Sequence, residues 1–460
     1  MEYRNKSCGE LSIKDVGQSV ILSGWIHSIR KKKTFVWLDL RDYYGVVQLF
    51  IENTVDCDCL HQLGREDVIR IQGVVNKRPI TNKKMETGDI EVKVSQIMLL
   101  SKCTWTPFTI GNDLSIEENT RLKYRFYDLR REEMKNNLIL RHKLAMLSRS
   151  FLISKGFIEV DTPCLTKSSV SGAHEFMVLS SKHKRKAYTL AQSPQLFMQL
   201  LMVGGFDKCF QIAHCFCDED QRTDRQPEFH QLHCEMAFAQ QEDVLALFEE
   251  YIHFVYYNIK HKQLGTIPVL SWKTCMEQYG TDKPDIRKDN EEFSPLWVID
   301  IPMFKWEKET LRYKTVHHPF IAPKEEDVPL LFNYNSIERI RTQSYNLIIN
   351  GVKVGGSSVR ITNKKIQNRV FQIMGLSNDE ITDKYGFLLN AFSYGVPPHA
   401  GMTFGFDRLC SIMNGSNNVR DYMAFPKNSK GKDTMLSIPE LIDRETLQKF
   451  GLEYSHVIDD

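Results

Sequence analysis

The stretch Phe210–Phe229, which reads FQIAHCFCDEDQRTDRQPEF, decides the fold and most of the chemistry of this chain. Its centre is an acidic run, Asp218-Glu219-Asp220, which is followed by Arg222 and Arg225. Cys217 stands directly ahead of the acidic run. A thiol at this position matters because it can neither carry positive charge nor donate two parallel hydrogen bonds to an anion, as an arginine would.

Size and charge limit the classes of protein that fit. The chain has 460 residues with 42% hydrophobic content, enough for a large core and for about two or three domains. Its formal net charge is only +2, so a nucleic-acid surface must be a local patch. Eleven cysteines without repeat spacing do not resemble a disulfide framework and favour a reducing compartment.

The sequence gives no sign of a membrane segment. A run of about 18 apolar residues is absent, so we expect no membrane association. The first residues, MEYRNKSCGEL, contain neither an apolar signal core nor an Arg/Ser-rich amphipathic leader. This composition fits a cytosolic protein, or an organellar protein whose leader is missing from the chain.

Residues 16–104 alternate apolar and polar side chains in five short runs, which predicts an antiparallel β-barrel. A basic patch, Arg30-Lys31-Lys32-Lys33, lies among Trp25, Phe35 and Trp37. Basic charge beside flat rings suits single-stranded nucleic acid, because each stacked base contributes ~1–3 kcal/mol. The residues alone equally allow a solvated turn beside ordinary core aromatics.

A charge-rich linker over residues 105–135 separates the barrel from a larger α+β domain, residues 136–460. Apolar spacing predicts a helix that ends at Gly156, followed by a strand over Phe157–Pro163. A second helix opens at Gln192-Ser193-Pro194, with Ser193 as N-cap, and projects Gln195 and Met198 from one face. A third is expected over Glu242–Tyr257.

Three ordered stretches resemble the motifs of the class II aminoacyl-tRNA synthetases, and are most similar to the bacterial and organellar aspartyl-tRNA synthetases. Phe210–Phe229 resembles motif 2, the helix and strand up to Pro163 resemble motif 1, and Gly401–Arg408 (GMTFGFDR) resembles motif 3. The resemblance implies an α+β multidomain protein with an N-terminal OB-fold β-barrel and a class II antiparallel-sheet catalytic-type domain. The bacterial insertion domain is absent near residues 286–295.

The same resemblance implies domain boundaries and partners. Residues 1–104 would be the OB-fold anticodon-binding domain, 105–135 a hinge and 136–460 the synthetase core. The partner would be tRNA, either tRNA-Asp or a related tRNA, and motif 1 would form a homodimer. Phe35 would stack on an anticodon base, while Arg30 and Gln48 would hydrogen-bond base edges.

The family joins aspartate to ATP, releases pyrophosphate, and then transfers the aspartyl group to tRNA. Four charged positions of that site are changed here. Cys217 replaces the arginine on the α-phosphate, and Met198 the lysine on aspartate's carboxylate. Asn346 and Lys353 replace two carboxylates that hold Mg²⁺. Loss of one preorganised contact typically costs ~10²–10³ in rate.

Other positions of the site match the family. Arg408 and Arg225 would contact the triphosphate, Glu219 the adenine or the acceptor end, and Gln195 and Arg360 the amino acid. Cys217, Glu219 and Arg408 occupy the catalytic positions, and Lys353 lies in the ATP-binding segment. A surviving arginine also has a purely structural interpretation, a salt bridge to Glu219 or Glu235. The neighbouring His317 and His318 fit a substrate role and a structural role equally well.

Three hypotheses follow. The first is a degenerate paralogue that binds tRNA in a regulatory or assembly role, with no metal or other cofactor and an unidentified protein partner. The second is an active ligase that uses ATP and Mg²⁺, with a rewired site. In it Lys353 takes the place of Mg²⁺ as a counter-charge for the phosphates, and Lys182, Lys184, Arg185 or Lys186 covers the α-phosphate. The third is a zinc site formed by Cys209, His214, Cys215, Cys217, His230, His233 and Cys234. The bacterial type of sequence places the protein in mitochondria, with the cytoplasm as the alternative.

Overall fold

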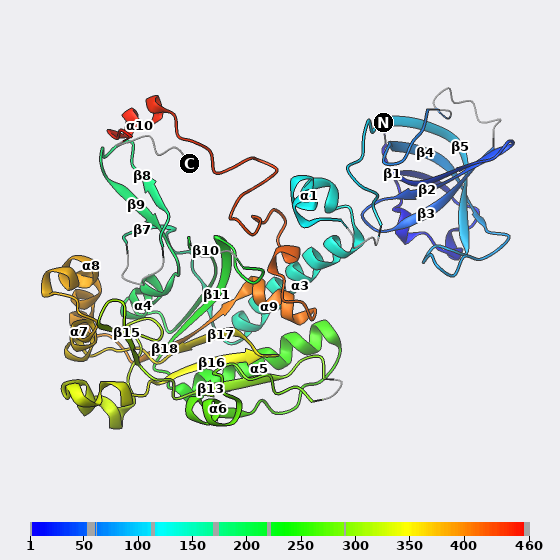
Figure 1. Cartoon of the computed structure of the whole chain (residues 1–460). Coiled ribbons are helices and arrows are strands. Elements are labelled where there is room, and N and C mark those ends of the chain that lie inside the picture. Colours follow the sequence, from blue (N-terminus) through cyan, green and yellow to red (C-terminus); the bar gives the residue numbers. More distant parts are fainter. Residues whose placement is uncertain are drawn as a thin grey trace. The chain divides into compact units, whose positions relative to one another are not determined.

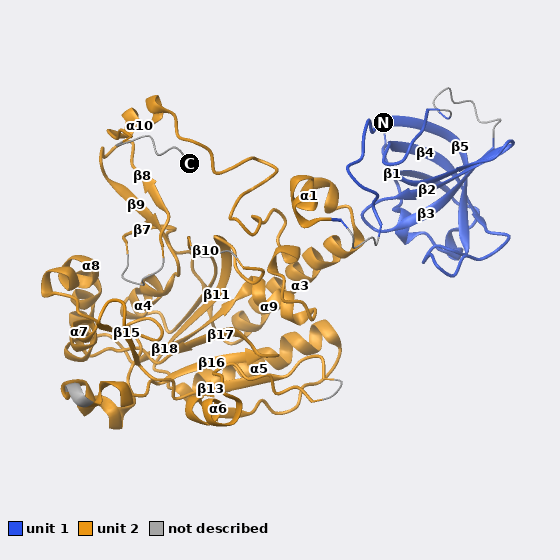
Figure 2. Ribbon diagram, viewed as in Figure 1, with its two compact units in different colours: residues 1–116 blue, residues 117–460 orange. Residues whose placement is uncertain are grey.

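The computed structural model describes residues 2–52, 60, 62–111, 116–168, 174–218, 222–288 and 291–454, with the side chains of 334 and 335 excepted. The chain divides into two compact units, Met1–Ile116 and Glu117–Asp460, which Figure 2 colours separately. The predicted linker is therefore shared between them: its last part contains helices α1 (Glu118–Lys123) and α2 (Arg125–Asp128) of the second unit.

The first unit is a closed five-stranded barrel with strand order β1-β2-β3-β5-β4 (Figure 1). Its strands are β1 (Ser19–Lys31), β2 (Phe35–Arg41), β3 (Val46–Glu52), β4 (Val68–Lys77) and β5 (Ile90–Ser101), with short 3₁₀ turns η1 (Cys8–Glu10) and η2 (Ile13–Asp15) ahead of them. Along β2 every second residue is buried, as the alternation predicts. Leu22, Leu38, Leu49 and Ile71 fill the interior, so the predicted barrel is confirmed.

The second unit is built on an eight-stranded sheet of order β12-β13-β16-β17-β18-β11-β10-β6. The strands are β6 (Ile158–Glu159), β10 (Lys208–Phe216), β11 (Glu228–Ala237), β12 (Val269–Ser271), β13 (Pro295–Ile299), β16 (Ser344–Ile349), β17 (Val352–Ser358) and β18 (His399–Gly405). The pairs β6–β10 and β12–β13 are parallel, and the others are antiparallel. The predicted α+β class with an antiparallel sheet is confirmed.

Helices α3 (Glu132–Ser154), α5 (Gln241–Lys260) and α9 (Phe406–Met413) cover one face of this sheet. Tyr251 of α5 packs on Phe404 of β18 with ring centroids 5.3 Å apart, and its hydroxyl lies 2.8 Å from Ser148 Oγ of α3. α3 ends where predicted, because Gly156 adopts a left-handed conformation with φ 83°.

The opposite face of the sheet is polar. Strand alternation turns Leu232 and Cys234 of β11 into the main core, and therefore turns Gln231, His233 and Glu235 to the other side. Helix α4 (Gln195–Val203) lies near this face; it begins one residue later than expected, with Pro194 as N-cap. Ser193 Oγ still accepts a hydrogen bond from the Gln195 backbone at 3.3 Å.

Smaller elements complete the unit. Two small sheets pair β7 (Leu165–Thr166), β9 (Ala187–Leu190) and β8 (Met177–Leu179), and β14 (Phe304–Glu307) with β15 (Arg312–Thr315). The remaining helices are α6 (Trp272–Tyr279), α7 (Lys364–Ile373), α8 (Asn378–Ala391), α10 (Arg444–Phe450), and the 3₁₀ turns η3 (Glu325–Phe332), η4 (Tyr334–Arg339), η5 (Phe392–Tyr394) and η6 (Val419–Tyr422). In the described residues no helix is long and apolar enough to cross a bilayer.

Candidate active site

A cavity of about 320 Å³ lies on the polar side of the sheet. It is bounded by the hairpin that joins β10 to β11, by β17 and β18, and by the start of α9. Four of the residues expected at the ATP site line this cavity: Cys217, Arg225, Lys353 and Arg408. It is also lined by residues that the sequence did not single out, among them Asp224, Phe229, Gln231 and Asp407. Positions 217 and 408 are far apart in the sequence, so it is the sheet that brings them together.

Arg408 is held in place by the turn between β10 and β11 and by strand β17. Its Nη2 donates to Asp224 Oδ2 at 3.0 Å, and its Nη1 donates to the backbone oxygen of Lys353 at 2.9 Å. Its Nε is buried and has no hydrogen-bond partner among the described residues. Burial lowers the pKa of Arg408, against the opposing effect of Asp224. The guanidinium is therefore fixed, and its Nε–H is left for a ligand.

Cys217 lies at the wall of the cavity, where the resemblance implies an arginine. Its backbone nitrogen donates to Pro227 O at 2.9 Å, which closes the base of the hairpin. Arg225, on the returning part of the hairpin, is exposed and lines this cavity and a larger one beside it. Glu219 lies outside the described residues, so its predicted role stays a prediction.

Asn346 and Lys353 are neighbours, as expected for two positions that share a site. Asn346 of β16 pairs in register with Gly356 of β17, and a side chain built on Gly356 would lie 2.4 Å from Asn346 Oδ1 and 3.0 Å from Lys353 Cε. Asn346 is buried. Burial, and then the charge of Lys283, lowers the pKa of Lys353 to about 8.

These residues do not fit a divalent cation. Asp224 and Asp407 are the carboxylates that line the cavity in the described part of the chain, and each is already paired, with Arg408 and with Arg141 respectively. No group of three or more His, Cys, Asp or Glu side chains suited to a metal ion occurs among the described residues. Magnesium requires oxygen ligands in near-octahedral geometry, which an asparagine beside an ammonium does not supply.

They do fit a polyphosphate. Arg225, Lys353 and Arg408 supply three cations around one cavity. Gln231 Oε1 is buried without a hydrogen-bond partner among the described residues, as is Arg408 Nε. Arg408 Nε is a donor and fits a phosphate oxygen, whereas Gln231 Oε1 is an acceptor and fits a hydroxyl or amino group of a ligand. Buried polar atoms are normally satisfied, so these two indicate a polar ligand. The aromatic ring of Phe229 adds a surface on which a base can stack.

A buried network of hydrogen bonds joins the residues expected to bind the amino acid. Arg360 donates from Nε and Nη2 to the two carboxylate oxygens of Glu235, at 2.8 and 2.9 Å. Its Nη1 lies 2.9 Å from His318 Nε2, and His318 Nδ1 lies 3.2 Å from Gln195 Nε2. Glu235 Oε2 also lies 3.1 Å from His233 Nε2. Of the two salt bridges that the sequence allowed for a surviving arginine, the structure therefore contains the one to Glu235, and its arginine is Arg360.

The charges of this network stabilise one another. Burial alone would raise the pKa of Glu235, but Arg360 outweighs burial and holds that pKa well below its usual range. Burial and Arg360 lower the pKa of His318, which keeps the imidazole neutral. His317 is also neutral, because burial lowers its pKa to about 3, and its Nε2 has no partner among the described residues.

Met198 lies apart from this network. Its fully buried side chain packs in a small apolar cluster with Met202 of α4 and Cys209 of β10, and the Cys209 sulfur lies 3.5 Å from the Met198 sulfur. A methionine fills such a gap well but brings no charge. Of the two cations that the resemblance implies for aspartate, Arg360 is the one present among the described residues.

The three predicted anticodon residues share one face of the barrel. Arg30 Nη2 donates to Gln48 Oε1 at 3.2 Å and to Asp39 Oδ1 at 3.1 Å. Phe35 lies beside them in a cluster of partly exposed rings, with its centroid 4.7 Å from Trp37 and 5.6 Å from Phe50. This face combines a cation, a primary amide and aromatic rings that are tilted against one another.

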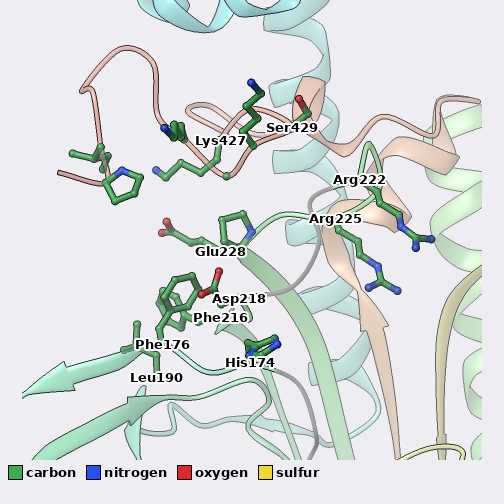
Figure 3. Close-up of a pocket in the computed structure, with 16 residues that line it drawn as sticks. His174, Phe176, Leu190, Phe216, Asp218, Arg222, Arg225, Glu228, Lys427 and Ser429 are labelled. Carbon is green, nitrogen blue, oxygen red and sulfur yellow. The ribbon is translucent and has the colours of Figure 1, made fainter. Parts of the chain in front are cut away.

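A second and larger pocket of about 1150 Å³ lies next to the cavity and shares Arg225 with it (Figure 3). Figure 3 shows Lys427 and Ser429 on one side and Phe176, Leu190 and Phe216 on the other. The charged residues of its lining are mostly cations: Arg222, Arg225, Lys427, Lys430 and Lys432 against Asp218 and Glu228. A volume of about 1150 Å³ and an excess of positive side chains in the lining suit the end of a nucleic-acid strand.

The described residues do not support the zinc interpretation. The β10–β11 register places Cys234 opposite Phe210 and Cys215 opposite Phe229, so these two cysteines lie at different heights along the hairpin. Cys234 packs in the main core, whereas Cys209 packs on the other side with Met198. No metal-binding group that contains them is found in the described part of the chain.

Comparison with known proteins identifies both units. Residues 117–429 match the family model "tRNA synthetases class II (D, K and N)", and residues 20–100 match "OB-fold nucleic acid binding domain". The chain is 34% identical to the aspartate–tRNA ligase of Porphyromonas gingivalis over 98% of this chain and 99% of that one. It is 36% identical to the aspartate–tRNA ligase of Thermosipho africanus, over 98% of each chain.

Solved structures share the fold. The aspartyl-tRNA synthetase of Entamoeba histolytica superposes with a TM-score of 0.72 at 19% identity, covering 91% of this chain and 90% of that one. The asparaginyl-tRNA synthetase of Pyrococcus horikoshii, complexed with asparaginyl-adenylate, gives 0.73 at 20% identity, covering 92% and 97%. The alignment with the Porphyromonas protein spans 582 positions, more than the 460 residues of this chain, so that relative contains residues missing here.

Proposed function

The chain belongs to the class II aspartyl-tRNA synthetase family, and we propose that it is an aspartate–tRNA ligase with a rewired active site. In this reaction a carboxylate oxygen of aspartate attacks the α-phosphorus of ATP and pyrophosphate leaves. The ribose of the terminal tRNA nucleotide then takes the aspartyl group and AMP is released. Similarity over nearly the whole chain to aspartate–tRNA ligases favours this function over the degenerate paralogue.

One observation carries the proposal: Arg225, Lys353 and Arg408 line a single cavity that also holds the unpartnered Arg408 Nε and Gln231 Oε1. Such charges act mainly by position, because they meet the triphosphate without reorganising. Arg408 is the best placed, since Asp224 and the backbone of β17 fix its orientation. Active members of the family use ATP and Mg²⁺. The described residues here suit ATP but do not suit Mg²⁺.

Arg360 is the residue we assign to the amino acid. Glu235 accepts from Nε and Nη2, and Nη1 is shared between His318 Nε2 at 2.9 Å and Ser358 Oγ at 3.1 Å, so the carboxylate of aspartate would bind Nη1 by displacing one of these two partners. Gln195, bonded to His318, lies at the same edge. Because Met198 adds no charge, we expect weaker binding of aspartate than in a relative with a lysine there.

We assign tRNA recognition to two surfaces. The face of the barrel that contains Arg30, Phe35 and Gln48 receives the anticodon, where rings stack on bases and polar groups meet base edges. The larger pocket around Arg222 and Lys427 receives the acceptor end.

A homodimer completes the assignment. β6 is an edge strand of the eight-stranded sheet, and its Ile158 is 55% exposed. On the adjacent helix α3, Met146 and Ile153 are 54% and 60% exposed. An apolar edge of this kind is normally covered by a partner, and these segments are those that resemble motif 1.

Met198 and Asn346 favour a second candidate, a tRNA-binding protein with impaired aminoacylation and a regulatory or assembly role. Both side chains are buried, neither bears charge, and each occupies a position where the family resemblance implies a charged group. The compartment, mitochondrial or cytoplasmic, stays a prediction.

Charging of tRNA-Asp with labelled aspartate by the purified full chain separates the two candidates. We expect aspartyl-tRNA to accumulate with aspartate and not with asparagine, and Arg408→Ala to abolish it. Exposed Lys305, on β14, gives a matched control: Lys305→Ala should charge at the wild-type rate. Absence of charging by a protein that binds the tRNA would instead establish the impaired candidate.

A further inference from the structure

We propose that Lys353 takes the place of a divalent cation in the nucleotide cavity, so that ATP binds this chain without metal. The inference deepens the proposed function and rests on it for the identity of the nucleotide. It follows from the misfit between the described residues and magnesium, and from the position of one ammonium group.

The described lining of the cavity does not suit a divalent metal ion. Its carboxylates among the described residues, Asp224 and Asp407, are each neutralised by an arginine. Asn346 offers one neutral oxygen, and the Lys353 side chain lies beside it. A divalent cation placed there would meet an ammonium and, among the described residues, no free pair of carboxylates, which costs both ligand and Coulomb energy.

The same position suits a phosphate. Lys353 lines the cavity with Arg408, whose Nη1 binds the backbone oxygen of Lys353 itself. The Lys353 ammonium forms no hydrogen bond or ion pair with any residue that the structure describes. An ammonium provides three donors on a compact charge, which matches a phosphate oxygen.

The groups facing Lys353 come from three other segments. Lys283 and Asp282 follow α6, His317 follows β15, and Arg408 opens α9. Asp282 favours the charged lysine, whereas burial, Lys283 and Arg408 disfavour it. A bound polyanion would offset the repulsion between Lys353 and the neighbouring Lys283 and Arg408. Lys353 is therefore available to pair with an anionic ligand.

Isothermal titration calorimetry of ATP into the full chain, in EDTA and in Mg²⁺, tests the proposal. We expect similar affinity in both buffers, within about threefold. Lys353→Met removes the charge at nearly constant volume and should weaken binding in EDTA by about 10- to 100-fold, the range of one charge-assisted contact. Lys353→Arg keeps the charge and should bind within about threefold of the wild type.

A double variant makes the test sharper. Asn346→Asp with Lys353→Glu introduces the two carboxylates that the family resemblance implies, and should lose ATP binding in EDTA and regain it in Mg²⁺. Lys305→Met, on the exposed strand β14, is the matched control and should behave as the wild type. Thermal melts of all variants are the control for correct folding.

Two results would overturn the proposal: wild-type binding that requires Mg²⁺, or Lys353→Met binding that equals the wild type in EDTA. Charging of tRNA tests the proposed function separately. Charging of tRNA together with Mg²⁺-dependent ATP binding would remove the role of Lys353 and leave the ligase. Metal-free ATP binding without charging would leave the role of Lys353 and remove the ligase.

Discussion

Removing one partner of the buried pair of Arg360 and Glu235 should destabilise the second unit. Glu235→Gln keeps the shape of the side chain but leaves the guanidinium of Arg360 buried without an anion, and breaking one partner of such a pair costs about 3–5 kcal/mol. The unit has roughly 340 residues, and an unfolding entropy of about 2.1 cal/mol/K per residue gives about 0.7 kcal/mol/K. The melting temperature should therefore fall by about 4–7 °C.

Scanning calorimetry at neutral pH measures this change, and an exposed ion pair supplies the control. Lys155 Nζ lies 2.6 Å from Glu250 Oε1, with side chains 33% and 56% exposed. Glu250→Gln should cost less than about 1 kcal/mol, or about 1.5 °C. If Glu235→Gln melts within about 1 °C of the wild type, the buried pair does not stabilise the fold as we infer.

The pH dependence of the same variant checks the cause. Glu235 has a lowered pKa in the folded state, so its contribution is fully present above the unfolded pKa of about 4.3 and is lost as pH falls towards the folded pKa. The difference between wild type and Glu235→Gln should thus be constant above about pH 5 and shrink below about pH 4. A difference that does not change over this range would contradict the assignment.

Three further predictions concern the ligands. Because the pKa of Lys353 is lowered to about 8, ATP affinity in EDTA should be constant below that value and fall as pH rises through it, and calorimetry should find this dependence absent in Lys353→Met. Phe35→Ala with Arg30→Ala should weaken tRNA binding by at least about tenfold in a filter assay, since each stacked base is worth ~1–3 kcal/mol, whereas Ile80→Ala, at an exposed loop position, should not. Cys217→Arg returns a cation to the cavity wall and should speed single-turnover charging by about 10- to 100-fold; an unchanged rate would mean that position 217 does not face the α-phosphate.

Local pattern was enough to predict much of the fold. The five barrel strands follow from alternation, because residues such as Leu38 and Leu49 must point inward for the barrel to close. The helix that ends at Gly156 follows from apolar spacing and from a residue that tolerates positive φ. The short strands β14 and β15 had no such signal, since four residues are too few to show a period.

The site was harder to predict, because its contacts cross the sheet. Arg360 and Glu235 are 125 residues apart, and Arg408 and Asp224 are 184 apart. Sequence patterns show which face of a strand a residue occupies, but strand order decides which residues it meets. The resemblance to a family supplied the positions of Arg408 and Lys353, whereas Asp224 as the anchor of Arg408 had no signal in one sequence.

The four changed positions illustrate the same limit. As lost charges they predict an inactive protein, whereas similarity to aspartate–tRNA ligases along nearly the whole chain favours an active one. Geometry shows why the two views differ, since Met198 is a packed core residue while Lys353 is a cation that lines the cavity. The first substitution leaves an apolar side chain in a packed cluster, and the second introduces a positive charge at the cavity.

Aspartate-dependent exchange of labelled pyrophosphate into ATP, measured on the full chain, tests the central claim most directly. It reports formation of aspartyl-adenylate alone, so neither tRNA recognition nor product release affects the result. We predict exchange that requires aspartate and is abolished by Arg408→Ala. Absence of exchange in a protein that still binds ATP and tRNA would contradict the account, and would make this chain a synthetase fold kept for recognition.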